Sequence, residues 1–483
     1  MSAMPQGQRP AQFPELIPDD HVLVLFGATG NLARRKLLPG LLHLFEANLL
    51  PGRFRIVATS QPRLSDDEFR AFARKAVEEF GRVAPSDAKW AAFAETISYV
   101  DAGDSAGLAK AVEAAGREIG TSNLLHYLAV PPAACAGIIA ALGETGLSHN
   151  ARVILEKPFG SDLATARALN EHVHQVFDES QLFRIDHYLG KEAVQNVLAL
   201  RFANGVFEML WNREFVDYVQ IDVPETLSIA GRADFYDRTG AFRDMIVTHL
   251  LQVLGFVAME PPSALTADAL HAETSRVFDA LRPLRREDVV RGQYHGYRDE
   301  PGVHPQSDTE TFVALRCFVD NERWAGVPFF LRTGKALAEG HRVVTIGTRE
   351  LASPLFAPPE GFPRRELVFD LGDPGRVYTH FLVKEPGPVH RLAAAPFAFT
   401  YASSFDTGDL LEAYERLIHD ALVGDGSLFT RAYGIERLWE VSTPVLEDLP
   451  PLQGYEPGSW GPDAIDDLIA PAEWHLPNGR VLR

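Results

Sequence analysis

The segment Arg184–Glu192, RIDHYLGKE, contains the densest group of residues suited to binding and proton transfer. Its candidate site residues are Asp186, His187, Tyr188 and Lys191. Lys, His and Tyr donate hydrogen bonds to phosphate oxygens, and Asp can orient an imidazole. The neighbours Ile185 and Leu189 are apolar, which predicts partial burial, and buried charges need partners. The segment is therefore a candidate site for an anionic ligand.

A second candidate, His249, lies in the apolar stretch Gly240–Glu260, which we expect to form a helix. The pattern alone favours a core histidine with a satisfied ring. Asp244 precedes His249 by five positions, about 140° around an α-helix, so the two would not share a face. If His249 is a base, its carboxylate partner comes from elsewhere, and Asp186 is the candidate.

A glycine turn near the N-terminus has the spacing of a dinucleotide-binding site. In HVLVLFGATGNLARRK, Gly27, Gly30 and Ala33 separate a strand-like run from a helical one. Gly27 permits a tight turn, Gly30 lets the backbone approach a pyrophosphate, and Ala33 lets the helix pack on the strand. The helix N-terminus offers free N–H groups to the phosphates. The predicted cofactor-binding residues of the turn are Gly27, Ala28, Thr29, Gly30, Asn31 and Leu32.

The second strand-like run, FRIVATS, indicates which dinucleotide binds. In NAD sites this strand usually ends in an acid that binds the ribose 2′-hydroxyl. Here it continues into Gln61 and Arg63 with no acid at its tip, and Arg63 could pair with a 2′-phosphate. NADP is therefore favoured over NAD. The alternative is that Arg63 is an ordinary solvated arginine.

Lys157 lies in the motif EKPFG, directly after another apolar run. In a doubly wound sheet the ligand crevice lies at the carboxyl ends of the strands, so Lys157 should point into it. A cis bond before Pro158 would fix the direction of the lysine. Taken alone, the motif also fits a turn lysine ahead of a helix.

Two patterns of hydrophobicity divide the chain. From His21 to about Arg184, apolar runs alternate with amphipathic helical stretches, which is typical of a parallel sheet covered on both faces. Beyond Phe202, period-two segments such as FVDYVQIDV and ELVFDL indicate antiparallel strands. We therefore expect a Rossmann-type doubly wound α/β domain at 16–186 and a larger α+β domain built on an antiparallel sheet at 187–483. Residues 1–15 are expected to be a disordered arm.

Composition limits the functions that remain. The chain has 483 residues, a formal charge of −19 and two cysteines far apart in sequence, Cys135 and Cys317. The charge argues against nucleic acid and anionic membranes as partners. The cysteines fit no zinc site or disulfide framework and suit the cytoplasm. The arm lacks the apolar core of a signal peptide, and the apolar run Leu250–Met259 is too short for a membrane helix.

Together these segments resemble a known family. In order, GATGNLARRK, YLAVPP, EKPFG, RIDHYLGKE, IVTHLLQ and VPFFLRTGKAL are similar to motifs of glucose-6-phosphate dehydrogenases. The late segment EAYERLIHDALVGDGSLFTR is similar to the C-terminal region of that family. RIDHYLGKE is the most specific element, and the resemblance runs from about His21 to about Pro450.

The resemblance implies an activity and a role for each candidate. The reaction would oxidise C1 of glucose 6-phosphate to the δ-lactone, the first step of the oxidative pentose phosphate pathway, with NADP, and also NAD, as hydride acceptor. His249 would be the general base, and Asp186 would hydrogen-bond it. The substrate-binding residues would be Lys157, His187, Tyr188, Lys191, Glu225, Asp244 and Lys335. His187, Tyr188 and Lys191 would bind the phosphate, Glu225 and Asp244 the sugar hydroxyls, and the other two lysines would bridge sugar and nicotinamide. A homodimer or homotetramer is implied, the dimer forming across the large sheet.

Three positions depart from the family pattern. Gly340 stands where a second basic residue is usual, and His341 or Arg342 could replace it. Gln61 aligns with the arginine that usually binds the 2′-phosphate, which makes use of both NAD and NADP plausible. Asn31 replaces a common aspartate. Two other functions remain open from sequence: a sugar oxidoreductase of the glucose–fructose oxidoreductase type, and a catalytically silent relative that senses dinucleotide.

Overall fold

The computed structural model describes residues 17–229, 231–350, 355, 365–372, 375–405 and 410–476; the predicted arm 1–15 lies outside them. The chain forms two compact units. Unit 1 comprises Met1–Lys157, Leu169–Gly190 and Leu411–Phe429, and unit 2 comprises Pro158–Ala168, Lys191–Leu410 and Thr430–Arg483. Leu411–Phe429, part of the predicted second domain, thus belongs to unit 1.

Unit 1 is built on a seven-stranded sheet with the order β15-β6-β5-β4-β1-β2-β3. Strands β1 to β6 pair in parallel. The strands are β1 (His21–Phe26), β2 (Phe54–Ser60), β3 (Ile97–Asp101), β4 (Leu124–Leu128), β5 (Ala151–Leu155), β6 (Leu182–Ile185) and β15 (Phe429–Thr430). All residues of β1 and β4 are buried, as expected for strands covered on both faces. The strand order reverses between β1 and β4, which is where doubly wound sheets bind ligands.

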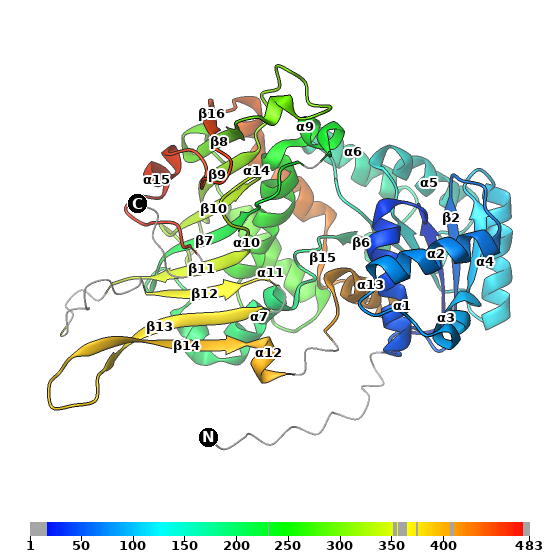
Figure 1. Ribbon diagram of the computed structural model, residues 1–483, viewed down its shortest axis with the longest axis horizontal. Helices are drawn as coiled ribbons and strands as arrows, with labels where there is room; N and C mark the ends of the chain where they lie inside the picture. Colours follow the sequence, from blue (N-terminus) through cyan, green and yellow to red (C-terminus); the bar gives the residue numbers. More distant parts are fainter. Residues whose placement is uncertain are drawn as a thin grey trace. The chain divides into compact units, whose positions relative to one another are not determined.

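Helices flank both sides of this sheet (Figure 1). They are α1 (Leu38–Glu46), α2 (Asp66–Phe80), α3 (Asp87–Ala94), α4 (Ser105–Ile119), α5 (Pro132–Glu144) and α13 (Ala413–Val423), with π-helical Ala33–Leu37 before α1 and the short η3 (Glu179–Gln181) before β6. Helix α6 (Leu163–His174) begins in unit 2 and ends in unit 1. The late helix α13 is joined to α1 by a bond between His43 Nδ1 and Glu415 Oε2 of 2.9 Å. Side-chain pairing therefore holds a segment from the end of the chain in unit 1.

Unit 2 is built on a nine-stranded sheet with the order β14-β13-β12-β11-β7-β10-β9-β8-β16 (Figure 1). The strands are β7 (Val216–Pro224), β8 (Val289–Tyr294), β9 (Phe312–Phe318), β10 (Pro328–Gly334), β11 (Val343–Thr348), β12 (Glu366–Asp370), β13 (Arg376–Lys384), β14 (Leu392–Thr400) and β16 (Leu452–Tyr455). Most pairs are antiparallel, but β7–β10 and β8–β16 are parallel. Long connections between those strands make parallel pairing possible. The predicted fold class, a Rossmann-type domain with an α+β domain on a mainly antiparallel sheet, is confirmed.

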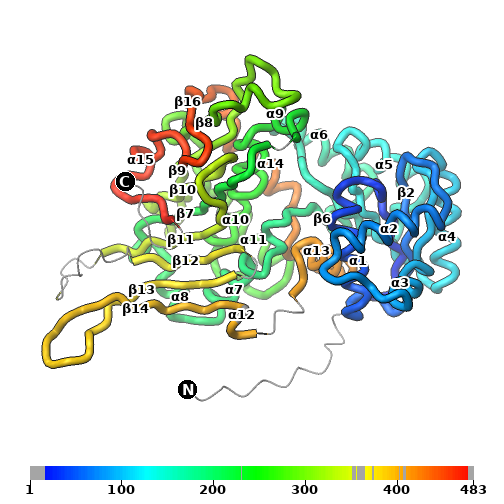
Figure 2. Tube along the Cα trace, in the orientation of Figure 1, coloured from blue at the N-terminus to red at the C-terminus, as the bar shows by residue number. Residues whose placement is uncertain are grey.

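The helices of unit 2 include the one that carries His249. They are α7 (Glu192–Ala203), α8 (Gly205–Leu210), α9 (Ala233–Ala241), η4 (Phe242–Leu250), α10 (Leu251–Ala258), α11 (Ala267–Ala280), α12 (Tyr401–Ser404), α14 (Ala432–Glu447) and α15 (Ala464–Ile469), with short turns η5 (Arg286–Asp288) and η6 (Tyr297–Asp299). The path of the chain through them is followed most easily in the tube view (Figure 2). By length and composition Ala233–Ala258 could cross a membrane, yet 89% of its most apolar window is buried, as in a core helix.

The helix predicted over Gly240–Glu260 has a break at its start and a π-helical first half. Gly240 has φ +69° and lies outside helical geometry, and η4 then runs to Leu250. Glu310 holds the start of η4, because its Oε1 accepts the N–H of Phe242 at 3.0 Å. At the other end the indoles of Trp211 and Trp324 donate to the Val257 and Ala258 carbonyls. Both ends of the helical segment are therefore fixed by buried polar contacts.

Candidate functional site

The glycine turn has the geometry of a phosphate-binding loop. Gly27 has φ +71°, and a Cβ atom there would lie 2.1 Å from the Ala129 carbonyl oxygen at the end of β4. The N–H of Gly30 donates to the Gly27 carbonyl at 2.8 Å, and Thr29 Oγ1 contacts Ser60 Oγ at 2.7 Å. Helical residues begin at Asn31 and include the π-helical Ala33–Leu37. The turn therefore closes tightly between β1 and β4 and presents a helix N-terminus.

A cavity of about 600 Å³ opens beside this turn. Its lining includes Gly27, Thr29, Gly30 and Gln61 of the predicted cofactor residues, together with Ala129 after β4. The cavity therefore lies at the switch point of the strand order, and its size is ordinary for a cofactor or drug-sized ligand. Because Gly27 has no Cβ, the turn can lie close to the end of β4. The tight turn of small residues beside this cavity therefore fits a dinucleotide.

Arg63, the predicted partner of a 2′-phosphate, forms an ion pair instead. Its Nε lies 2.9 Å from Asp101 Oδ2, and its side chain is 93% exposed. An exposed pair of this kind is worth about 0–1 kcal/mol, so a ligand phosphate could displace it at little cost. Gln61 lines the cavity and Arg63 does not line it. The second strand thus presents a neutral side chain to the cavity and a cation at its rim.

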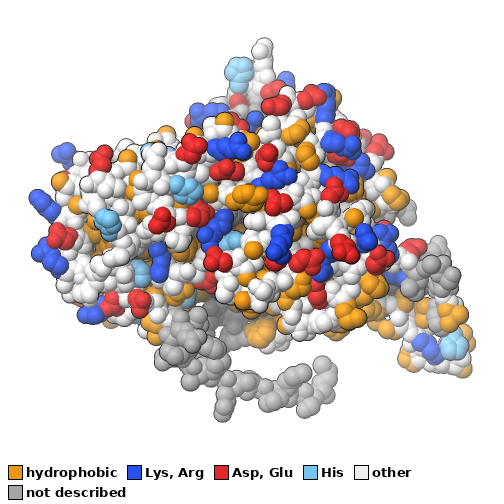
Figure 3. Space-filling view, turned by 180° about the vertical axis from the view of Figure 1, so that it is seen from behind, with side chains coloured by type: hydrophobic (Ala, Val, Ile, Leu, Met, Phe, Trp, Pro, Cys, Tyr) orange, Lys and Arg blue, Asp and Glu red, His pale blue; other side chains and the backbone are white. Residues whose placement is uncertain are grey.

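The cluster of basic residues after the turn is engaged with carboxylates. Arg34 pairs with Glu79, and Lys36 Nζ lies 2.8 Å from Glu412 Oε2. The guanidinium carbons of Arg34 and Arg35 also lie 5.2 and 5.1 Å from the centre of the Phe80 ring. Acidic and basic side chains are likewise interspersed on the face shown in Figure 3. Arg34 and Lys36 are therefore partnered within the protein.

The end of β5 carries Glu156 and Lys157. Lys157 is half-buried, and the bond before Pro158 is not cis; within the described residues the cis bond is Ala470–Pro471. The Tyr127 hydroxyl donates to Glu156 Oε1 at 2.6 Å. Burial raises the pKa of Glu156 to about 7. Sequence reasoning passed over this glutamate in favour of the lysine, although a charged residue at the end of an apolar strand was a usable signal.

The RIDHY segment follows β6 as a buried turn. Asp186 is 1% exposed, and its Oδ1 accepts the N–H of Tyr188 at 2.9 Å. The His187 ring lies 4.9 Å from the ring of Tyr188, which is buried, and 6.2 Å from that of Tyr414 in a parallel arrangement. The predicted partial burial of this segment is therefore observed, and its aspartate holds the turn.

Lys191 occupies the N-cap position of α7 in unit 2. A cation at a helix N-terminus is disfavoured by the helix dipole by about 0.3–1 kcal/mol, and Lys is not a capping residue. The α7 N-cap forms no side-chain capping hydrogen bond. Local helix stability therefore does not explain a lysine at this position. A bound anion would, because both the lysine and the helix N-terminus attract negative charge.

His249 and Asp244 both lie in η4 and are buried, 1% and 9% exposed. The expectation that they occupy different faces assumed an α-helix and is wrong for the observed geometry. Because π-helical hydrogen bonds join residues five apart, positions 244 and 249 fall on the same side. Burial and the Asp244 carboxylate raise the pKa of the neighbouring Tyr236. π-helical turns are frequent at functional sites.

Glu225 and Lys335 are brought together at the ends of two paired strands. They form a salt bridge, and the N–H of Glu225 donates to the Gly334 carbonyl at 2.9 Å. Lys335 Nζ lies 5.8 Å from the centre of the Tyr236 ring, which is close to Asp244. Three of the predicted substrate residues, Glu225, Asp244 and Lys335, therefore gather around one buried tyrosine.

His341 does not take the place of the missing basic residue at Gly340 as a free cation. Its Nε2 lies 2.8 Å from Asp222 Oδ2, and its side chain is 7% exposed. Asp222 and its partner Arg332 were missed from sequence, because a period-two strand pattern does not show which polar residues face inward.

Predicted contacts between a residue of unit 1 and a residue of unit 2 stay predictions. Lys157, Asp186, His187 and Tyr188 belong to unit 1, whereas Lys191, Glu225, Asp244, His249 and Lys335 belong to unit 2. The predicted hydrogen bond from Asp186 to His249 is one such contact.

Two family models match the chain. The NAD binding domain of glucose-6-phosphate dehydrogenase matches residues 24–196, and the C-terminal domain of the same enzyme matches residues 198–475. The chain belongs to the glucose-6-phosphate dehydrogenase family. The family resemblance predicted from the motifs is thereby confirmed, and with it a domain for a nicotinamide dinucleotide.

Curated relatives and solved structures of the family cover nearly the whole chain. Glucose-6-phosphate 1-dehydrogenases of Treponema pallidum and Aggregatibacter actinomycetemcomitans are 41% and 39% identical, covering 96% and 95% of this chain and 96% and 97% of those proteins. The crystal structure of the Mycobacterium avium enzyme has a TM-score of 0.84 at 36% identity, covering 95% of this chain and 99% of that one. A glucose-6-phosphate dehydrogenase in complex with its substrate glucose-6-phosphate has a TM-score of 0.87 at 33% identity, covering 94% and 97%.

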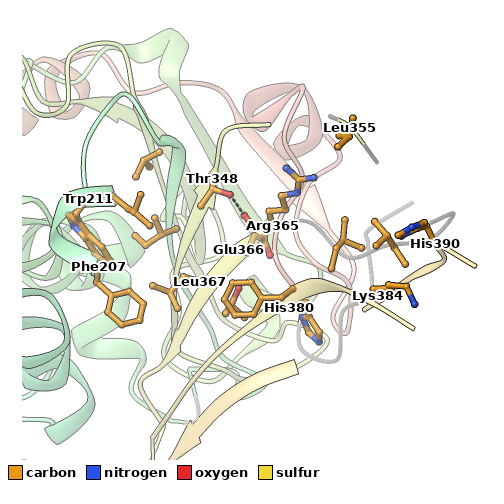
Figure 4. A pocket seen from close by; sticks show the side chains of 17 residues that line it. Phe207, Trp211, Thr348, Leu355, Arg365, Glu366, Leu367, His380, Lys384 and His390 are labelled. Carbon is orange, nitrogen blue, oxygen red and sulfur yellow. Dashed lines mark hydrogen bonds between the residues drawn. The ribbon is translucent and has the colours of Figure 1, made fainter. Parts of the chain in front are cut away.

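A second cavity, of about 640 Å³, lies in unit 2 and contains none of the predicted site residues. It runs from Phe207 and Trp211 past Leu367 to Lys384 and His390 (Figure 4). Its walls are mostly apolar, which makes it a poor site for a sugar phosphate.

Proposed function

We propose that this protein is a glucose-6-phosphate 1-dehydrogenase. It oxidises C1 of D-glucose 6-phosphate to 6-phospho-D-glucono-1,5-lactone and transfers the hydride to NADP+, with NAD+ as a second acceptor. The observation that carries the proposal is identity of about 40% to relatives of this activity over nearly the full length of both chains. The ranges matched by the family models include the segments proposed for catalysis, which favours an active enzyme over a silent relative. The match of both family models disfavours the glucose–fructose oxidoreductase alternative.

His249 acts as the general base. Its ring nitrogen takes the proton of the C1 hydroxyl while the hydride leaves C1, and the bound nicotinamide supplies the acceptor. Asp186 accepts a hydrogen bond from the imidazole and stabilises the imidazolium that forms. Histidine suits this step, because its imidazole is the side chain most often used as a general base. The burial of both side chains supports the proposal, since water cannot compete for their hydrogen bonds.

The other site residues bind and orient the substrate. His187, Tyr188 and Lys191 hold the phosphate, and Glu225 and Asp244 accept hydrogen bonds from sugar hydroxyls. Lys157 and Lys335 lie between sugar and nicotinamide and fix the geometry of hydride transfer. The gathering of Glu225, Asp244 and Lys335 near Tyr236 supports a common sugar subsite.

The turn residues Gly27, Ala28, Thr29, Gly30, Asn31 and Leu32 bind the dinucleotide, with Gln61 and Arg63 near its ribose. The absence of an acid at the tip of β2 favours NADP+, because β2 itself presents no carboxylate to a 2′-phosphate and Asp101 of the adjacent β3 is paired with Arg63. Gln61 in place of an arginine, and the exposed pair of Arg63 with Asp101, support acceptance of NAD+ as well.

We also propose that the enzyme acts in the cytoplasm as a homodimer, or as a homotetramer assembled from such dimers. The large sheet of unit 2 forms the dimer contact. Phe381, Val383 and Phe397 of β13 and β14 support it, because these large apolar side chains are exposed. Light scattering of the purified protein measures the mass of the assembly.

The activity is tested by the rise in absorbance of reduced nicotinamide. Purified protein with glucose 6-phosphate should reduce NADP+, and more slowly NAD+, whereas free glucose should react poorly. No reduction of either dinucleotide would overturn the proposal.

His249→Ala tests the assigned base. Turnover should fall by about two to four orders of magnitude, the usual scale for loss of a general base. Steady-state rates measure kcat, and a dinucleotide titration of the variant checks that unit 1 is intact. Near-normal turnover with normal dinucleotide binding would remove His249 from the reaction.

A further inference from the structure

A buried carboxylate joins three adjacent strands of unit 2 beside the proposed sugar subsite. Asp222 lies on β7, Arg332 on β10 and His341 just before β11, and β7 lies between β10 and β11 in the sheet (Figure 1). Arg332 binds both carboxylate oxygens, Nε to Oδ1 at 2.8 Å and Nη2 to Oδ2 at 2.5 Å. His341 Nε2 binds Oδ2 at 2.8 Å.

The Asp222–Arg332 pair is fully enclosed. Asp222 and Arg332 are 0% exposed, and the rings of Trp474 and Trp460 lie 4.4 and 5.2 Å from the guanidinium carbon. Although burial favours the neutral carboxyl, Arg332 and His341 lower the pKa of Asp222 to about 2. A buried ion pair contributes little net stability compared with apolar side chains of similar volume. Its geometry is therefore the property to be explained.

The position of the group relative to the sugar subsite gives that explanation. Asp222 and Arg332 are directly opposite each other in the parallel β7–β10 pair. Three residues beyond this pair, the ends of the two strands lead to Glu225 and Lys335, which form an ion pair with each other. The register that the buried pair fixes is thus the register in which these two side chains meet. A change of register would move both residues.

The same carboxylate also holds both ends of the loop 335–342. Arg332 precedes the loop, and His341 closes it with two contacts to β7: the ring to Asp222 and the backbone N–H to the Pro224 carbonyl at 3.3 Å. Within the loop the N–H of Leu337 donates to the Glu225 carbonyl at 2.9 Å. Lys335 therefore lies in a loop tied to β7 and to Glu225, the residue that directly follows that strand.

We propose that Asp222, Arg332 and His341 are positioning residues that hold Glu225 and Lys335 in the geometry required by the sugar phosphate. This assignment rests on the proposed function, because Glu225 and Lys335 matter to catalysis only if they bind that substrate. His341 thus acts through Asp222 and does not replace the basic residue missing at Gly340.

His341→Phe tests the proposal, since the ring remains and the hydrogen bond to Asp222 is lost. Hydrogen exchange of the peptide 335–342, followed by mass spectrometry, should accelerate about ten- to hundredfold, the scale for loss of a charge-assisted hydrogen bond. For glucose 6-phosphate, kcat/KM should fall by roughly the same factor, because small displacements of positioning groups cost up to about 100-fold. NADP+ affinity, which depends on unit 1, should be unchanged.

Two further variants separate positioning from general damage. His341→Gln restores a donor and should recover most of the wild-type exchange and kcat/KM. His295→Phe removes a comparable histidine–glutamate contact, His295 with Glu456, in an exposed place and should change neither quantity. If His341→Phe does not fold, Arg332→Lys, which keeps the charge and loses the two-point contact, is read by the same criteria.

The possible outcomes separate the two proposals. Unchanged exchange in His341→Phe, or faster exchange with unchanged kcat/KM, overturns the positioning role. Failure of His341→Gln to recover either quantity also overturns it. A wild-type protein that shows no turnover with glucose 6-phosphate but ordered exchange at 335–342 overturns the proposed function instead.

Discussion

Two helix N-termini in this protein are proposed to receive phosphate groups, and they are built in opposite ways. In unit 1 the helix that begins at Asn31 follows a turn of small residues, and the basic residues after it, Arg34 and Lys36, are paired with carboxylates. In unit 2 α7 begins after Lys191, a cation that local helix stability disfavours. The dinucleotide would therefore be recognised by backbone shape and the sugar phosphate by charged side chains.

The carboxyl groups of Glu156 in unit 1 and Asp222 in unit 2 also differ, in the charge of the groups that bind them. Glu156 in unit 1 is hydrogen-bonded by a neutral tyrosine, and its pKa rises to about 7. Asp222 in unit 2 is bound by a guanidinium and an imidazole, and its pKa falls to about 2. Burial acts on both groups, so the charge of the partner decides the outcome.

Gly27→Ala should have the largest effect, and it tests whether the dinucleotide is recognised by the backbone shape of the glycine turn. The new Cβ would lie 2.1 Å from the Ala129 carbonyl oxygen, so the turn must move. We expect KM for NADP+ to rise by at least about 100-fold, because misplaced positioning groups cost on that scale. Gly120→Ala is the matched control in the same unit: its φ is +77° and its nearest non-local atom lies 3.7 Å away. If KM remained normal in Gly27→Ala, recognition by backbone shape would be wrong.

Lys191→Ala tests the site built from charge. Loss of a charged hydrogen-bonding partner costs about 1.5–3 kcal/mol, so KM for glucose 6-phosphate should rise roughly ten- to hundredfold. The advantage in kcat/KM of glucose 6-phosphate over free glucose should also become smaller, since glucose lacks the phosphate. Arg276→Ala, which removes a cation of α11 in the same unit whose side chain is 71% exposed, should leave both values unchanged. An unaltered preference in Lys191→Ala would remove Lys191 from the phosphate site.

Glu156→Gln tests whether folding raises the pKa of Glu156, and the readout is the dependence of Tm on pH. Because the pKa of Glu156 is raised from 4.5 to about 7 in the folded state, the wild type loses stability as pH rises through that window. The Tm of the variant relative to the wild type should therefore increase between pH 5 and 8. The exposed Glu144→Gln is the control. Asp222 has the opposite sign: its contribution is present above about pH 4 and is lost as pH falls towards 2. A flat Tm difference for Glu156→Gln would contradict the raised pKa.

Arg63→Ala should have the smallest effect. An exposed ion pair is worth at most about 1 kcal/mol, so the preference for NADP+ over NAD+ should fall by no more than about fivefold. Initial rates with each dinucleotide at equal concentration measure the preference. A preference for NADP+ over NAD+ that did not change at all in Arg63→Ala would exclude Arg63 and leave backbone groups near Gln61 as the source of the selectivity.

Local patterns predicted most of the fold because they carry its periodicity. The apolar runs before Gly27 and Lys157 became β1 and β5 of a parallel sheet, and the period-two segments became β7 and β12. The glycine turn was found from spacing, since only small residues fit its geometry. The π-helical form of η4 was not foreseen, because hydrophobic periodicity gives similar signals for α- and π-helical turns.

The sequence by itself determined the family, the fold class and the chemical types available at the site, because these depend on local spacing and on motifs. Only the tertiary structure decided which of those groups are paired. It directed His341 to Asp222, Arg63 to Asp101 and the tyrosine hydroxyl of Tyr127 to Glu156. The physical reason is that the charge and pKa of a side chain depend on partners brought from distant parts of the chain, and no local pattern encodes them.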